Sequence, residues 1–128
     1  MKLLFDTHTF IWWDSDSTKL SSRVFALCQD PTNNLLLSAA SVWEMQIKFQ
    51  LGKLTLRLPL ADLIAHQQKT NNIILMEITH AHVLALEGLP MPHKDPFDRL
   101  LVTQANAEGA GLLSCDPIFA HYPVKVIW

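Results

Sequence analysis

The sequence lacks the features that mark several specialised classes of protein. It has only two cysteines, Cys28 and Cys115, without the spacing of a zinc site. They lie far apart in apolar surroundings, so we expect reduced thiols in the core of a cytosolic protein. No apolar run approaches the ~20 residues of a membrane span, and the first run ends at Asp6, too early for a signal peptide. We therefore expect a cytoplasmic protein with no membrane association.

An excess of positive charge is also missing. The 128 residues carry a formal net charge of −2, with 17% charged and 49% hydrophobic residues. This balance disfavours a large basic surface that binds the phosphates of a nucleic-acid backbone. It allows an enzyme that binds phosphates through metal ions. The sequence shows no repeat, low-complexity tract or linker, and its length suits one core. We expect a single domain over residues 1–128.

Short apolar segments alternate with segments of helical periodicity along the chain. The expected strands are residues 2–5, 35–38, 73–76, 112–115 and 124–127. The expected helices are residues 10–13, about 19–29, 40–50, 59–69, 80–86 and 96–108. Continuous apolar strands are typical of a parallel sheet covered on both faces. The pattern predicts an α/β fold with a central, mostly parallel sheet of about five strands.

The stretch HKDPFDRLL, residues 93–101, opens the central helix of this pattern. Asp95 is suited to the N-cap and Pro96 to the first helical position. We interpret Asp95 as a helix cap. Asp98 then falls in the first turns, where it either complements the helix dipole or belongs to a site.

Four acidic residues fall where ligands bind in parallel sheets, beyond the carboxyl ends of the strands. Asp6 and Asp116 follow predicted strands, while Glu44 and Asp98 occupy early turns of helices that reach the same edge. We expect no lysine or arginine among them except Arg99, on the next face of its helix. Carboxylates that converge repel one another, at a cost of a few kcal/mol for each close pair. A proton or a cation must therefore offset the repulsion. Oxygen ligands suit Mg²⁺ or Mn²⁺. The pattern leaves open a metal site or four separate caps and surface charges.

Four short motifs resemble those of the PIN-domain nucleases, specifically the VapC-like toxin ribonucleases of bacterial toxin–antitoxin pairs. The motifs are residues 3–8 (LLFDTH), 41–45 (SVWEM), 95–105 (DPFDRLLVTQA) and 113–119 (LSCDPIF). Each is short, but all four occur in the family's order across the whole chain. The resemblance implies a PIN-like three-layer α/β/α domain and an endoribonuclease dependent on Mg²⁺ or Mn²⁺. The implied catalytic and metal-holding residues are Asp6, Glu44, Asp98 and Asp116.

The resemblance also implies secondary site residues and partners. Asp95, Thr7 and Ser114 are the secondary candidates, and Ser114 stands where the family often has a threonine. The implied partners are an RNA substrate, a cognate antitoxin and a second copy of the chain. Two other functions stay open. A phosphoacceptor signalling domain would need a lysine after a late strand, where only Lys125 is available, and a non-catalytic binding module would use its acids as caps.

The remaining histidines and tryptophans have plainer interpretations. His93 is interpreted as a histidine of a surface loop. His80 and His82 fall on different faces of a helix, which disfavours a zinc site. The tryptophans are expected to build a core or a dimer face rather than to stack on bases; they are Trp12, Trp13 and Trp43.

Overall fold

The computed structural model describes residues 1–128 and contains one sheet of five parallel strands. The strands are β1 (Lys2–Phe5), β2 (Asn34–Ser38), β3 (Ile74–Met76), β4 (Gly111–Leu113) and β5 (Val126–Ile127). Their order is β3-β2-β1-β4-β5, so the chain winds outward from β1 to β3 and then returns to the other side of β1. The winding reverses between β1 and β4, which is where parallel α/β sheets bind ligands.

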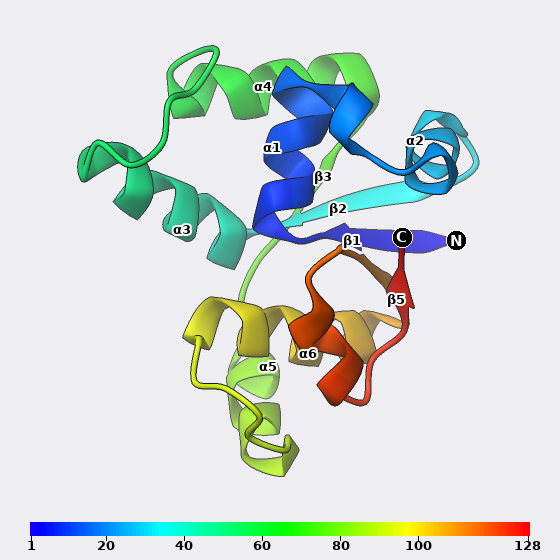
Figure 1. Ribbon diagram of the computed structural model, residues 1–128, viewed down its shortest axis with the longest axis vertical. Helices are drawn as coiled ribbons and strands as arrows, with labels where there is room; N and C mark the ends of the chain where they lie inside the picture. Colours follow the sequence, from blue (N-terminus) through cyan, green and yellow to red (C-terminus); the bar gives the residue numbers. More distant parts are fainter.

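Six α-helices cover the two faces of the sheet. They are α1 (Thr7–Ser15), α2 (Ser22–Gln29), α3 (Ala39–Gln50), α4 (Leu60–Asn71), α5 (His80–Leu84) and α6 (Pro96–Glu108). Three short 3₁₀ helices join them: η1 (Ser17–Lys19), η2 (Ala85–Gly88) and η3 (Pro117–His121). Figure 1 shows α1, α3 and α4 on one side of the strands and α5 and α6 on the other. The predicted three-layer α/β/α architecture is confirmed, and none of the helices is long and apolar enough to cross a membrane.

Strand β1 is buried on both faces, as its unbroken apolar run predicts. Leu3 and Phe5 enter one core, where they join Phe10 of α1. Leu4 points to the other face and packs in a second core with Leu101 of α6. Because successive side chains of a strand alternate between faces, a central strand between two helical layers needs apolar residues at every position.

The start of the second helix differs from the prediction. Residues 17–19 form η1 as a separate turn, and α2 begins at Ser22. Ser21 caps it by accepting a hydrogen bond from the Val24 N–H at 3.1 Å. The sequence prediction merged the two elements because several residues with capping side chains occur in succession here.

The fourth strand ends earlier than predicted, at Leu113. The Ser114 N–H still donates to the Ile127 carbonyl of β5 at 3.3 Å, while its hydroxyl binds the Asp6 carboxylate and the Asp116 N–H. Cys115, the next residue, lies at the surface, so its expected place in the core is wrong. Cys28 is buried as expected, and both thiols are free.

Candidate functional site

Asp6 lies at the switch point of the sheet, at the carboxyl end of β1. Its N–H donates to the Leu113 carbonyl of β4 at 3.1 Å. One carboxylate oxygen caps α1 by accepting from the Thr9 N–H at 2.7 Å, and the other accepts from the Ser114 hydroxyl. The side chain is buried, and burial raises the pKa of the Asp6 carboxyl although these hydrogen bonds oppose the rise.

Ser114 joins Asp6 to the segment that carries Asp116. Its hydroxyl donates to Asp6 and accepts from the Asp116 N–H at 3.0 Å. Asp116 is exposed and caps η3 through the Ile118 N–H at 3.0 Å. The negative charges of Asp6 and Asp116 both add to the rise that burial causes in the Cys115 pKa, so both carboxylates lie near that residue. The two acids that follow β1 and β4 thus occupy one edge.

Glu44 belongs to α3, which follows β2, and its side chain is buried. Its Oε2 lies 2.9 Å from the Lys48 ammonium, one helical turn further on. The expectation that no basic residue other than Arg99 would accompany the acids is therefore wrong. The i,i+4 spacing of Glu and Lys was the signal for this pair. Near the same helix start, the Thr7 hydroxyl of α1 donates to Ser41 of α3 at 3.1 Å.

Asp95 and Asp98 lie at the start of α6. Asp95 is the N-cap, as predicted, and accepts from the N–H groups of Phe97 at 2.9 Å and Asp98 at 3.2 Å. The pKa of Asp98 is raised to about 6, chiefly by burial and further by the negative charges of Asp95 and Glu44. The influence of Glu44 places α3 beside the start of α6, where the rings of Trp43 and Phe97 also meet at 5.1 Å.

His93 is the residue that sequence reasoning missed. It was interpreted as a surface histidine, but its Nε2 lies 3.0 Å from Asp98 Oδ2 and its Nδ1 lies 2.7 Å from the Tyr122 hydroxyl. Its place two residues before the N-cap Asp95 was the available signal, because that position lies near the first helical turn. Nothing in the local spacing indicates Tyr122, which is 29 residues away.

The predicted site residues thus fall into two groups at the carboxyl edge of the sheet. Asp6 and Asp116 meet through Ser114, while Asp98 lies near Asp95 and Glu44. No three histidine, cysteine or acidic side chains lie close enough together to surround one ion. Several carboxylates instead have partners of their own: Asp6 has Ser114, Glu44 has Lys48 and Asp98 has His93.

Other residues considered from the sequence have structural roles. His82 caps α5 by accepting from the Thr79 N–H at 3.1 Å, while His80 is exposed. Trp12 and Trp13 pack against the core, but Trp43 is 59% exposed. Trp43 is therefore not part of the core, and its expected place in a dimer face stays a prediction.

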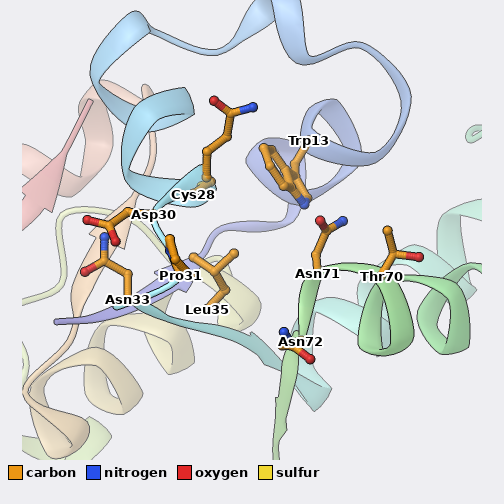
Figure 2. Close-up of a pocket in the computed structure, with 10 residues that line it drawn as sticks. Trp13, Cys28, Asp30, Pro31, Asn33, Leu35, Thr70, Asn71 and Asn72 are labelled. Atoms are coloured by element: carbon orange, nitrogen blue, oxygen red, sulfur yellow. The ribbon is translucent and has the colours of Figure 1, made fainter.

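A hollow at the opposite edge of the sheet does not belong to the site. Figure 2 shows it beside Leu35 at the start of β2 and Asn72 just before β3. Trp13 and Asn71 line it, and both donate to the side-chain oxygen of Gln67, at 3.1 and 2.7 Å. The acids follow the other ends of the strands, so this hollow is remote from them.

Comparison with known proteins extends these observations. Residues 3–125 match the family model described as PIN domain. The chain belongs to the PIN domain family. The matched range contains all four motifs that carried the resemblance, so family membership inferred from them is confirmed. The acids Asp6, Glu44, Asp98 and Asp116 all lie within this range.

Individual relatives add detail to the PIN domain assignment. Ribonuclease VapC16 of Mycobacterium tuberculosis (strain ATCC 25618 / H37Rv) is 39% identical over 57 residues, which are 44% of this chain and 40% of that protein. The match thus spans less than half of the relative. The structure of VapBC2 from Rickettsia felis, bound to a promoter DNA fragment, has a TM-score of 0.74 at 13% identity and covers 100% of this chain and 98% of that chain. The structure of VapBC-1 from nontypeable Haemophilus influenzae has a TM-score of 0.60 at 17% identity. That match covers 91% of this chain and 87% of the other chain. These two likenesses show a shared fold.

Proposed function

We propose that this PIN domain protein is a metal-dependent endoribonuclease and the toxin of a toxin–antitoxin pair. The observation that carries the proposal is a family match over residues 3–125, within which Asp6 and Asp116 follow the two strands that flank the switch point of the sheet. The partial match to a ribonuclease supports the same activity. The proposed catalytic residues are Asp6, Glu44, Asp98 and Asp116.

The strongest competing function is a binding module whose acids only cap helices. Capping accounts for Asp6, Asp95 and Asp116, each of which accepts a hydrogen bond from a backbone N–H near a helix start. It does not account for Glu44, which lies in the interior of α3 and is only 8% exposed. Lys48 offsets the charge of Glu44, but capping does not explain why this buried carboxylate lies near a second acid, Asp98. We therefore favour the catalytic function.

The donors in the site suit Mg²⁺ or Mn²⁺, which we propose as the cofactor. The four acids offer only oxygen atoms, and Mg²⁺ commonly uses one or two carboxylates together with water, so a closed cage of side chains is not needed. Burial is the main cause of the raised Asp98 pKa and the charges of Asp95 and Glu44 add to it, and a bound cation would favour the charged carboxylate against both effects. Asp6 with Asp116, or Asp98 with Glu44, would supply one or two carboxylates to an ion whose other ligands are water molecules. When bound, it would activate water and stabilise charge on the scissile phosphate.

The side chains around the acids would prepare them for this task. Ser114 orients Asp6 and ties it to the Asp116 backbone. Lys48 holds Glu44 and supplies positive charge at the rim, where an RNA phosphate could be bound. Thr7 and Asp95 act more remotely, because Thr7 ties α1 to α3 and Asp95 caps α6.

A phosphoacceptor domain is disfavoured by the position of the lysine that it would need. Lys125 directly precedes β5, and its carbonyl accepts from the Leu112 N–H at 2.8 Å. It therefore lies toward the amino ends of the parallel strands. Asp6 follows the carboxyl end of β1, so Lys125 is at the wrong edge to contact a phosphorylated aspartate there.

An exposed apolar groove supports the proposed protein partners. It has a volume of about 480 Å³ and lies between α3, α4 and β3, where it is lined mainly by Val42, Trp43, Ile64, Leu75 and Met76. Trp43 is 59% and Leu75 44% exposed, and exposed apolar patches of this kind mark interaction sites. We propose that an antitoxin and a second copy of the chain cover apolar surface on this protein.

Cleavage of an RNA pool tests the proposed activity. We expect cleavage in Mg²⁺ or Mn²⁺, none in excess EDTA, and poor support by Ca²⁺, whose looser geometry misplaces the attacking water. Glu44→Gln should lose activity. Asp62→Asn is the control, because Asp62 is an exposed acid in the first turn of α4. Undiminished cleavage in EDTA, or a fully active Glu44→Gln variant, would contradict the proposal.

A further inference from the structure

His93 connects two segments that carry proposed site acids. It precedes α6, whose first turn contains Asp98, and it contacts Tyr122, which directly follows η3 and is buried. The N-cap of η3 is Asp116. A single imidazole therefore links the start of the Asp98 helix to the segment that begins at Asp116.

The donors and acceptors around His93 define a directed chain of hydrogen bonds. Arg99 Nη1 lies 3.2 Å from the Tyr122 hydroxyl, and a guanidinium can only donate, so the hydroxyl oxygen accepts there. The hydroxyl proton then has two acceptors: His93 Nδ1 at 2.7 Å and the His93 carbonyl at 3.4 Å. The shorter contact is to Nδ1. This shorter contact favours an unprotonated Nδ1, which places the imidazole proton on Nε2, 3.0 Å from Asp98 Oδ2.

We propose that His93 is a positioning residue, which Tyr122 and Arg99 hold in one tautomer so that it orients the Asp98 carboxylate toward a divalent cation. This inference rests on the proposed function. With Oδ2 engaged by His93, Asp98 Oδ1 has no hydrogen-bond partner within the protein and can serve as the ligand atom. Groups that orient ligating side chains commonly change metal affinity 10- to 100-fold when they are removed.

Support of the preceding loop does not explain the arrangement of His93. Arg99 already holds that loop, because Nη1 donates to the Pro90 carbonyl at 2.7 Å and Nη2 to the Leu86 carbonyl at 3.4 Å. Neither bond involves the imidazole. The His93 ring reaches instead toward Asp98, and its contact with Tyr122 determines which nitrogen faces the carboxylate.

The tautomer can be tested by NMR without metal or RNA. The ¹⁵N signals of the His93 ring in EDTA should show a protonated Nε2 and an unprotonated Nδ1. Tyr122→Phe keeps the aromatic ring but removes the hydroxyl, so it should shift the tautomer equilibrium. Exposed His121, which lies just before Tyr122, provides the control, and His121→Gln should leave the His93 signals unchanged. A proton on Nδ1 in the unsubstituted protein would overturn the inference.

Calorimetric titration with Mn²⁺ alone tests the consequence for the cation. His93→Ala should weaken Mn²⁺ binding about 10- to 100-fold, and Tyr122→Phe about 10-fold. His93→Gln places an amide donor near Asp98 and should recover most of the affinity, while His121→Gln should bind like the unsubstituted protein. Melting in EDTA identifies any variant that is unfolded, and Tyr122→Phe provides an independent test if His93→Ala does not fold.

The outcomes separate this inference from the proposed function. If the unsubstituted protein binds Mn²⁺ and cleaves RNA while folded His93→Ala and Tyr122→Phe bind Mn²⁺ equally well, the positioning role is wrong and the function stands. If the unsubstituted protein neither binds Mn²⁺ nor cleaves RNA, the proposed function fails, and this inference fails with it. Weaker binding by both variants with recovery in His93→Gln supports the positioning role.

Discussion

Replacing Asp98 by asparagine should stabilise the metal-free protein. The pKa of Asp98 rises from an ordinary value of 3.8 to about 6, with burial as the largest cause and the charges of Asp95 and Glu44 adding to it. The folded state therefore disfavours the charged carboxylate. Asparagine has nearly the same shape and keeps an oxygen that can accept from His93, but it carries no charge.

The size of this effect follows from the difference between the two pKa values. A rise of about two pH units corresponds to about 3 kcal/mol at a pH well above both values. The Asp98 side chain is 21% exposed, so solvent screens part of this cost. Asparagine also gives up a favourable interaction with the α6 dipole, of about 0.3–1 kcal/mol. We expect Asp98→Asn to raise the free energy of unfolding by about 1–2 kcal/mol at pH 7.5.

The pH dependence gives the prediction a distinct signature. Between pH 4 and 6 the folded state binds more protons at Asp98 than the unfolded state does, so the contribution of Asp98 to stability falls as the pH rises through this window. Above about pH 6 the contribution of Asp98 to stability has been lost completely. The gain from Asp98→Asn should therefore be small near pH 4, grow toward pH 6 and remain constant at higher pH.

Urea unfolding in EDTA between pH 4 and 8 measures this gain. Asp95→Ala is the matched comparison, because it removes the neighbouring acid together with its cap bonds to Phe97 and Asp98. Asp95→Ala should lower the free energy of unfolding by about 1 kcal/mol, a change opposite in sign to that of Asp98→Asn. If Asp98→Asn is less stable than the unsubstituted protein throughout this range, the folded state does not disfavour the charged Asp98 carboxylate and our interpretation of Asp98 is wrong.

Three further predictions follow from the site and the fold. Asp6→Asn should cut cleavage in Mg²⁺ by about a hundredfold or more. It should also raise the melting temperature in EDTA, because burial raises the Asp6 pKa and so disfavours the charged carboxylate. A variant that melts at a lower temperature and still cuts RNA would contradict this prediction. Gly109→Ala should cost about 1 kcal/mol in urea unfolding and leave cleavage unchanged, because Gly109 ends α6 at φ 62° with nothing close to the added methyl group. Light scattering during size-exclusion chromatography should give the mass of a dimer, and a clean monomer at micromolar concentration would count against self-association.

The fold could be predicted from local patterns because each pattern has a direct physical cause. The unbroken apolar run at residues 2–5 indicated a strand covered on both faces, and Asp95-Pro96 with Gly109 marked the two ends of α6. Boundaries failed where side-chain bonds competed with the pattern. β4 ends just before Ser114, whose hydroxyl binds Asp6, 108 residues away in the sequence.

The immediate surroundings of the proposed acids were harder to predict. Lys48 was within reach of sequence reasoning, because it lies one helical turn from Glu44. The contact between His93 and Tyr122 was not, because it depends on how η3 packs beside the start of α6. Thus an acid can be located by the strand or helix that carries it, whereas its hydrogen-bond partners depend on the tertiary fold.

The separation between Asp6 and Ser114 has a consequence during protein synthesis. The ribosome makes β1 early, but its neighbour β4 and the serine that holds Asp6 are made more than a hundred residues later. A nascent chain therefore lacks part of the proposed catalytic edge until translation has passed Ser114. Contacts between such distant segments also slow folding, because a long loop must close before they form. A nuclease built this way would remain inactive toward its own messenger RNA until the ribosome has passed the codon for Ser114.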